Sequence, residues 1–189
     1  MSNSDAIASA VTCLREGGII AYPTESVFGL GCDPLNEAAV RRILALKKRT
    51  LSAGLILVGG NFEQLLPFMG RLPEQVTAKL VSSWPAPVTW IVPASRSTPA
   101  WVTGERDTIA VRIPDLEIAR DLCTAFDGAL VSTSANPSGK AAARSADDVK
   151  GYFPTSIDYI LDSATGGLPF PSEIRDALSD EILRPASEE

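Results

Sequence analysis

The 189-residue sequence contains no histidine. This absence excludes a Ser-His-Asp triad, a Cys-His nucleophile pair, a histidine general base and every metal site built on histidine. Catalysis would therefore depend on lysine, arginine, backbone amides, carboxylates, hydroxyls or a bound cation. Phosphoryl and nucleotidyl transfer suit this set of groups, because those reactions need mainly charge stabilisation and alignment.

Cysteine is scarce, and the three residues of this type, Cys13, Cys32 and Cys123, lie far apart. An odd number at wide spacing supports neither a disulfide framework nor a Cys-x-x-Cys metal site. Because Cys13 and Cys123 fall at apolar positions of expected helices, we interpret both as packing residues. The sequence therefore predicts no metal site built from protein side chains.

Long apolar runs and a basic leader are also missing. No stretch approaches the roughly 20 apolar residues of a transmembrane helix, and Met1 to Asp5 lack the positive charge that begins a signal peptide. We therefore expect a cytoplasmic protein without membrane contact. The net charge of -6 argues against nucleic-acid binding over the whole surface, but leaves a local basic patch open.

Helical and strand patterns alternate along the chain, which predicts an α/β fold in a single domain. Helices are expected over Ser4–Glu16, Asn36–Lys48, Pro73–Ser83, Pro114–Phe126 and Ser145–Tyr152, with a short helix starting at Asn61. Strands are expected over Ile19–Tyr22, Leu55–Val58, Val88–Val92, Thr108–Ile113, Ala129–Thr133 and Ile157–Leu161. Ser95–Gly104 is expected to be a loop, and the segment after Pro171 has no firm pattern.

The first expected strand leads into a polar segment. Pro23 removes a ladder donor and is expected to end the pairing, so that Thr24–Ser26 leave the carboxyl end of the strand. In an open α/β sheet that end is where ligands bind. An ordinary polar turn, with Gly29 and Gly31 as turn glycines, explains the same residues.

Two further polar features have both a functional and a structural explanation. Ser132, Ser134 and Asn136 are two residues apart, so their side chains could share one face of extended backbone and point into one pocket. They are also typical of a turn that bonds its own backbone. Lys47 and Arg49, at the end of an expected helix, indicate either a phosphate clamp or a solvated helix terminus.

Arg112 lies among apolar residues in an expected strand. A buried guanidinium must be paired with a carboxylate of the protein or of a ligand, and we favour the ligand. Ser138-Gly139-Lys140 superficially matches a phosphate-binding loop, but Ser134 stands where the earlier glycine is required and Ala141 follows the lysine. That interpretation therefore fails.

Four motifs follow one another along the chain: Pro23-Thr24-Glu25-Ser26-Val27-Phe28-Gly29-Leu30-Gly31, Lys47-Lys48-Arg49, Ala110-Val111-Arg112 and Ser132-Thr133-Ser134-Ala135-Asn136. Together they resemble the YrdC family of threonylcarbamoyl-AMP synthases, closest to the short bacterial TsaC type. The family's Lys-x-Arg and distant Ser-x-Asn are intact as Lys47/Arg49 and Ser134/Asn136. The resemblance extends from about Ile7 to Leu183.

The resemblance implies a single YrdC-like domain over residues 1–189, with a twisted mixed sheet flanked by helices and a concave, positively lined ligand cavity. It implies a nucleotidyltransferase that makes L-threonylcarbamoyladenylate and pyrophosphate from L-threonine, bicarbonate and ATP. In the family this product serves threonylcarbamoyladenosine modification of tRNA. Other tRNA threonylcarbamoylation proteins are the expected partners, and a weak contact with tRNA itself is left open.

The resemblance also assigns roles to residues. Lys47 and Arg49 would be catalytic and would meet the phosphates of ATP, with Mg²⁺ expected to help them stabilise the leaving pyrophosphate. The other expected nucleotide contacts are Thr108, Ser134, Asn136, Ser172 and Arg175. The expected threonine contacts are Thr24, Ser26, Arg112 and Ser132.

The sequence departs from the family pattern at two positions. Val58 stands where some relatives have histidine, and Ala86 stands where a Trp-Pro-Gly-Pro turn would have glycine. Longer relatives carry a second C-terminal domain, which we do not expect in this chain.

Two other functions stay open at this point. A carbamoyl-adenylate-forming enzyme, as in hydrogenase-maturation proteins with a similar domain, would use carbamoyl phosphate, but those proteins add acylphosphatase-like and zinc-finger segments. This sequence has neither the length nor the cysteines for them. An RNA-binding or ribosome-maturation factor fits a basic cavity, but the net charge and the absence of RGG or RNP motifs weaken that interpretation.

Overall fold

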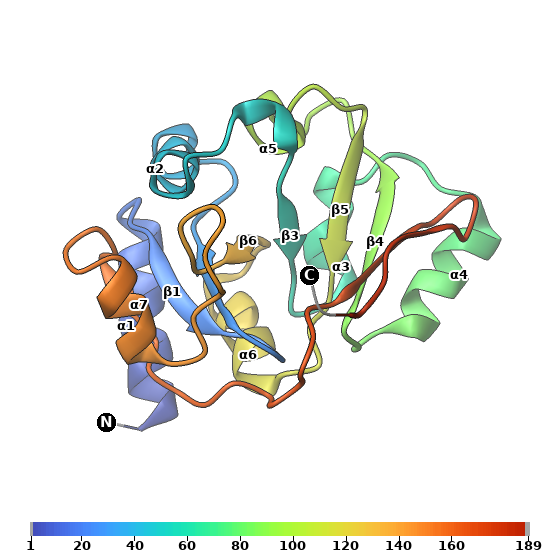
Figure 1. The fold of residues 1–189 in the computed structure, drawn as a ribbon. Coiled ribbons are helices and arrows are strands. Elements are labelled where there is room, and N and C mark those ends of the chain that lie inside the picture. Colours follow the sequence, from blue (N-terminus) through green and yellow to red (C-terminus); the bar gives the residue numbers. More distant parts are fainter. Residues whose placement is uncertain (1, 188–189) are drawn as a thin grey trace.

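A computed structural model describes residues 2–187, and a sheet of nine strands forms its centre (Figure 1). The strands are β1 (Ile20–Pro23), β2 (Phe28–Gly31), β3 (Ile56–Val58), β4 (Val88–Pro93), β5 (Thr108–Arg112), β6 (Leu130–Ser134), β7 (Tyr159–Ile160), β8 (Glu173–Asp176) and β9 (Ile182–Arg184). Neighbours in the sheet follow the order β7-β1-β2-β6-β3-β5-β4-β8-β9. Parallel pairs such as β3 with β5 occur beside antiparallel pairs such as β1 with β2, which confirms the expected mixed sheet.

Helices cover both faces of this sheet (Figure 1). They are α1 (Asn3–Arg15), α2 (Glu37–Lys47), α3 (Phe62–Leu65), α4 (Glu74–Ser83), α5 (Ala100–Thr103), α6 (Glu117–Phe126) and α7 (Ala146–Tyr152), with 3-10 turns at Leu51–Ala53 and Leu66–Phe68. In the described part of the chain, none of these helices combines the length and the apolar character needed to cross a membrane.

The alternation of strand side chains separates two hydrophobic clusters. Ile20 and Leu130 pack with α1 and α6 on one face, whereas their neighbours Ala21 and Val131 join the larger cluster on the other face. The larger cluster takes in buried residues of α2, α4 and α7. The sheet is therefore covered by apolar helix faces on both sides, as in other layered α/β domains.

Local capping explains where several helices begin. Ser2 and Asp5 form a capping box at the start of α1, and Ser145 and Asp148 form another at the start of α7. The Asn36 side chain accepts a hydrogen bond from the backbone N–H of Ala39, so the predicted N-cap of α2 is confirmed.

The sequence-based expectations were wrong or incomplete at four elements. The first strand ends at Pro23, one residue later than expected, and the expected polar segment follows it, because Thr24–Val27 form the turn between β1 and β2. β2 was not expected at all. The expected loop over Ser95–Gly104 contains α5, and the segment without a firm pattern forms the hairpin of β8 and β9.

Candidate active site

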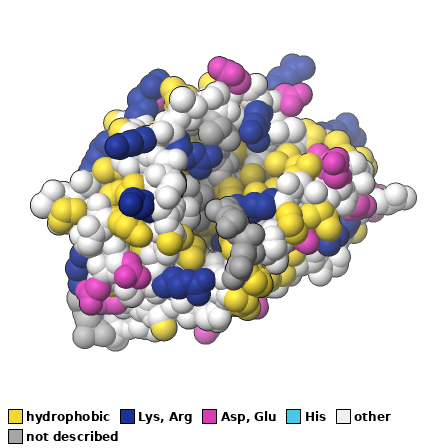
Figure 2. Space-filling view, in the orientation of Figure 1, with side chains coloured by type: hydrophobic (Ala, Val, Ile, Leu, Met, Phe, Trp, Pro, Cys, Tyr) yellow, Lys and Arg dark blue, Asp and Glu magenta, His cyan; other side chains and the backbone are white. Residues whose placement is uncertain are grey.

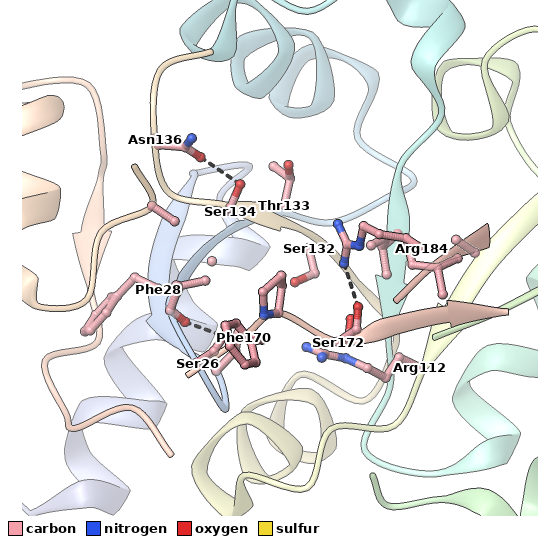
Figure 3. Close-up of a pocket in the computed structure, with 18 of the residues that line it drawn as sticks. Ser26, Phe28, Arg112, Ser132, Thr133, Ser134, Asn136, Phe170, Ser172 and Arg184 are labelled. Atoms are coloured by element: carbon pink, nitrogen blue, oxygen red, sulfur yellow. Dashed lines mark hydrogen bonds between the residues drawn. The ribbon is translucent and has the colours of Figure 1, made fainter. Parts of the chain in front are cut away.

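A cavity of about 900 Å³ is hollowed into one face of the molecule (Figures 2 and 3). Its wall comes from the β1–β2 turn, the segment after α2, strands β3, β5 and β6, the loop after β6, and the segment leading into β8. This volume lies within the range of pockets that enclose a small-molecule ligand or cofactor.

The wall of the cavity is strongly cationic. It contains six basic side chains and, among the described residues, no aspartate or glutamate; the six are Arg49, Arg106, Arg112, Lys140, Arg144 and Arg184. Figure 2 shows Lys and Arg gathered around the hollow, with acidic side chains farther out on the same face. A chain of net charge -6 thus concentrates positive charge in one place, which favours an anionic ligand.

The register of the sheet sets the long direction of the cavity. Across β3, Arg112 of β5 lies level with Leu130 of β6, and Ser132 and Ser134 follow at two-residue steps along β6. Arg112 and Ser134 are therefore separated by roughly 13 Å along the strands. We call the region around Ser134 and Asn136 the lysine end and the region around Arg112 the arginine end.

The lysine end joins the two predicted signature motifs. Lys47 Nζ donates to the carbonyl and side-chain oxygens of Asn136, each at 3.0 Å, and to the carbonyl oxygen of Ser134. Ser134 Oγ in turn donates to Asn136 Oδ1 at 2.7 Å (Figure 3). Ser134 and Asn136 form part of the wall, whereas Lys47 is buried and reaches the site through them.

The end of α2 explains why Lys47 and Arg49 reach the same site. Lys48 adopts a left-handed conformation at φ 52°, which stops the helix. The backbone N–H of Arg49 then donates to the carbonyl of Leu44 at 2.9 Å, so the chain folds back over the last turn. The Arg49 side chain consequently lines the cavity, with a long hydrogen bond of 3.5 Å from its Nη1 to Thr133 Oγ1.

Arg49 is close to a second cation. Burial and the neighbouring charge of Arg106 both lower the pKa of the Arg49 guanidinium below its ordinary value of 12.5. Within the described residues, neither arginine has a carboxylate within ion-pair distance. An anionic ligand between them would relieve their mutual repulsion.

Arg112 finds its charge partner within the protein. Its Nη2 lies 3.3 Å from Glu25 Oε2, and both side chains are less than a tenth exposed. Glu25 Oε1 accepts the backbone N–H of Asp115 at 2.9 Å. We favoured a ligand carboxylate as the partner of Arg112, but the structure pairs it with Glu25. Arg112 still lines the cavity, and its guanidinium has more N–H donors than one carboxylate partner uses.

The predicted hydroxyl residues also line the cavity. Thr24 Oγ1 donates to the carbonyl of Val27 at 2.7 Å and closes the β1–β2 turn, beside Ser26. Ser132 lies between the two ends of the cavity, and Ser172 enters from the segment before β8 (Figure 3). The structure therefore brings Thr24, Ser26, Ser132, Ser134, Asn136 and Ser172 to one cavity with Arg49 and Arg112.

Two predicted contacts do not reach this cavity. Thr108 lines a small adjoining pocket of about 30 Å³. Arg175 pairs with Glu173 and lies on the face of β8 opposite Ile174, which does line the cavity. The alternation of side chains along β8 explains the difference, because neighbouring residues of a strand point to opposite faces.

Arg184 takes the place expected for Arg175. It lines the cavity from β9, and its Nη2 donates to the carbonyl of Ser172 at 2.7 Å (Figure 3).

Sequence reasoning also missed Glu25 and Arg106 as parts of this site. Val58, where some relatives have histidine, is fully buried and is not part of the wall. The signal that could have indicated Arg184 was an arginine directly after the apolar pair Ile182-Leu183, at the end of β9.

The composition of the wall does not fit a resident divalent metal. Mg²⁺ prefers carboxylate and phosphate oxygens, and the described wall has no carboxylate. Across the described residues, no group of three or more His, Cys, Asp or Glu side chains is arranged to hold a metal ion.

Comparison with known proteins identifies close relatives. A family model described as Telomere recombination, for the Sua5, YciO and YrdC proteins, matches residues 12–186. A threonylcarbamoyl-AMP synthase of Halorhodospira halophila is 49% identical over 178 residues, which cover 94% of this chain and 93% of the relative. A protein of the same name from Pseudoalteromonas translucida is 45% identical over 186 residues, covering 97% of this chain and 100% of the relative.

Solved structures show the same fold. Sua5 of P. abyssi in complex with L-threonine superposes with a TM-score of 0.86 at 35% identity, covering 93% of this chain. The match covers 52% of the Sua5 chain, so this chain spans about half of that protein's length. E. coli YciO, at 22% identity, has a TM-score of 0.81 and covers 100% of this chain and 92% of its own, which supports the fold alone. By sequence and by structure, the chain belongs to the Sua5/YciO/YrdC family.

Proposed function

We propose that this protein is a nucleotidyltransferase that makes L-threonylcarbamoyladenylate and pyrophosphate from L-threonine, bicarbonate and ATP. One observation carries the proposal: a single cavity holds a strongly cationic lysine end and, roughly 13 Å along the strands, a buried arginine. This arrangement suits a ligand that joins phosphates to an amino acid. The names of the relatives and the threonine complex of P. abyssi Sua5 support the same choice.

The proposed reaction needs no protein nucleophile. The amine of threonine condenses with bicarbonate to give a carbamate and water, and a carbamate oxygen then attacks the α-phosphorus of ATP. The bond from that phosphorus to the bridging oxygen breaks, and pyrophosphate leaves. Lys47, acting through its place beside Ser134 and Asn136, and Arg49 would stabilise the charge on the phosphates, because fixed cations in a partly desolvated site act strongly.

At the arginine end, Arg112 would bind the threonine carboxylate, since a guanidinium can donate to two oxygens at once. Thr24, Ser26 and Ser132 would shape the rest of the amino-acid pocket. Thr108 would act only from the adjoining pocket, and Arg184, rather than Arg175, would supply the late nucleotide contact next to Ser172. Mg²⁺ would enter as the ATP complex, held by phosphates, because the described wall offers no carboxylate.

The product is the activated form of a threonylcarbamoyl group, so we propose that it is passed on for threonylcarbamoyladenosine modification of tRNA. Other tRNA threonylcarbamoylation proteins would be the receiving partners. We propose a cytoplasmic location, where ATP and tRNA are both available to the enzyme.

The test is pyrophosphate release by the purified protein with ATP, bicarbonate and threonine, omitting each in turn. We expect release that requires all three substrates and yields L-threonylcarbamoyladenylate. Release that ignores threonine and requires carbamoyl phosphate would instead indicate a carbamoyl-adenylate-forming enzyme. No release, together with salt-dependent RNA binding, would indicate an RNA-binding factor.

A further inference from the structure

Tyr22 is a fully buried tyrosine whose hydroxyl points at the cavity wall. It lies on β1, and its hydroxyl donates to Ser132 Oγ on β6 at 2.8 Å. Tyr22 is not part of the wall itself, whereas Ser132 is. A buried phenol hydroxyl usually finds a hydrogen-bond partner, so the bond alone does not distinguish packing from function.

The route that Tyr22 takes to Ser132 is unusual. β1 and β6 are not neighbours, because β2 lies between them, and Tyr22 is paired with Gly29 of β2. A Cβ atom on Gly31 would lie 2.8 Å from Tyr22 Cε1 and 3.0 Å from the carbonyl oxygen of Val131. A Cβ atom on Gly29 would lie 3.4 Å from the same ring atom. The ring therefore crosses β2 over Gly31, where a Cβ atom would collide with it, whereas a Cβ atom on Gly29 would make an ordinary contact.

Because Tyr22 donates the hydrogen bond to Ser132, the hydroxyl hydrogen of Ser132 must point away from Tyr22. Burial raises the pKa of the Tyr22 phenol above its ordinary value of 10.0, so the phenol stays protonated and acts as a donor throughout the neutral range. Ser132 Oγ accepts the hydrogen bond from Tyr22, and within the described residues the Ser132 hydroxyl itself donates to no acceptor. The Ser132 proton is thus left for a ligand.

Ser132 lies on the wall, level with Ala110 of β5 across β3. It is therefore one two-residue step from Ser134 and one two-residue step from the position level with Arg112. A ligand that reaches from the arginine end to the lysine end would place its central group beside Ser132. In the proposed reaction that central group is the carbamate, whose oxygens are hydrogen-bond acceptors.

We propose that Tyr22 is a positioning residue that holds the Ser132 hydroxyl as a donor toward the carbamate group of the bound substrate. This inference rests on the proposed function, and it adds a residue outside the wall to the recognition of the amino-acid half. It also gives Gly31 a specific purpose, because a side chain there would block the path by which the Tyr22 ring reaches Ser132 across β2.

The test is a double-mutant cycle with Tyr22→Phe, Ser132→Ala and the double variant, assayed by pyrophosphate release. Tyr22→Phe removes only the hydroxyl, and we expect it to lower kcat/KM for threonine about three- to tenfold, with KM for ATP almost unchanged. In the Ser132→Ala background, Tyr22→Phe should have no further effect, because the hydroxyl that it positions is gone. The ratio between wild type and Tyr22→Phe should stay constant from pH 6.5 to 9, as the phenol does not titrate there.

Tyr159→Phe is the matched control. Tyr159 packs against the same hydrophobic cluster as Tyr22, and its hydroxyl makes no hydrogen bond among the described residues. Its kinetic constants should equal those of wild type.

Three results would overturn the inference while the proposed function stands: an unchanged Tyr22→Phe enzyme, equal effects on threonine and ATP, or independent, multiplying effects in the double variant. If Tyr22→Phe fails to fold, Gly31→Ala gives a second route, since its Cβ displaces the ring. It should again affect threonine selectively and have no effect beyond that of Ser132→Ala. A wild-type protein without threonine-dependent release would reject the proposed function itself, and this inference with it.

Discussion

The two ends of the cavity both contain basic side chains, but they differ in whether those side chains are paired with a carboxylate of the protein. At the arginine end, the guanidinium of Arg112 lies against the carboxylate of Glu25, and both are buried. At the lysine end, Lys47 donates to uncharged oxygens of Ser134 and Asn136, and the nearby Arg49 and Arg106 lie within ion-pair distance of no described carboxylate. Arg112 is thus balanced by a protein carboxylate, whereas Arg49 and Arg106 give the lysine end excess positive charge.

This difference matches the ligand that we propose. Triphosphate carries several negative charges, so excess cations stabilise it and are stabilised by it. An amino-acid carboxylate carries one charge, and Arg112 can bind it while paired with Glu25, because a guanidinium has five N–H donors. The pairing also prevents the buried guanidinium from destabilising the empty protein.

Removal of Glu25 should have the largest effect on stability. Glu25→Ala leaves Arg112 buried without its carboxylate, and we expect the free energy of unfolding to fall by about 3–5 kcal/mol, as measured by urea denaturation. The control is Glu37→Ala, which breaks the exposed pair with Arg41 and should cost no more than about 0.5 kcal/mol. Similar losses for the two variants would show that the arginine end is not held by its buried pair.

Replacement of Lys47 should have the largest effect on activity at the lysine end. We expect Lys47→Ala to lower kcat about 10²- to 10³-fold, because a fixed cation near the phosphates is lost. Lys48→Ala is the neighbouring control, since Lys48 is exposed and outside the cavity. If both variants keep wild-type rates of pyrophosphate release, Lys47 has no role in the chemistry.

Arg112→Lys should change the KM for threonine and not the KM for ATP, if the two ends of the cavity bind different substrates. Lysine keeps the charge beside Glu25 but loses the planar fork, so we expect KM for threonine to rise about tenfold while KM for ATP changes little. Steady-state kinetics with each substrate varied in turn would measure this. An equal rise for both substrates would contradict the assignment of Arg112 to the amino-acid half.

Arg106→Ala should have the smallest effect of these variants, and the effect should be on ATP rather than on threonine. Arg106 is exposed, so solvent screens its charge, and we expect KM for ATP to rise about two- to fivefold with KM for threonine unchanged. Arg96→Ala, an exposed arginine outside the cavity wall, should behave as wild type. A threonine-specific effect of Arg106→Ala would contradict the division of the cavity into two ends.

Sequence reasoning succeeded where the signal was local. The capping residue Asn36 and the apolar stripe of α2 correctly predicted the helix that carries Lys47. β2 was missed because Phe28-Gly29-Leu30-Gly31 contains two glycines, which are rare in strands, and its pairing depends on its neighbours in the sheet.

The candidate site was predictable where family motifs mark it, and less so where distant segments meet. No local pattern relates Glu25 to Arg112, since 87 residues of chain separate these partners and only the sheet brings them together. Likewise, Arg184 belongs to a hairpin of short, partly charged strands, which form against β4 rather than by their own propensity. Such contacts depend on tertiary packing, which overrides local preference.

The wall of the cavity is basic, whereas the chain as a whole has a net negative charge, so the electrostatic field that a molecule experiences depends on whether it can enter the cavity. A molecule small enough to enter meets the arginines of the wall at close range, whereas a large polyanion that stays outside experiences the field of the whole acidic chain. The net charge of the chain therefore says little about the charge that a small ligand meets inside the cavity.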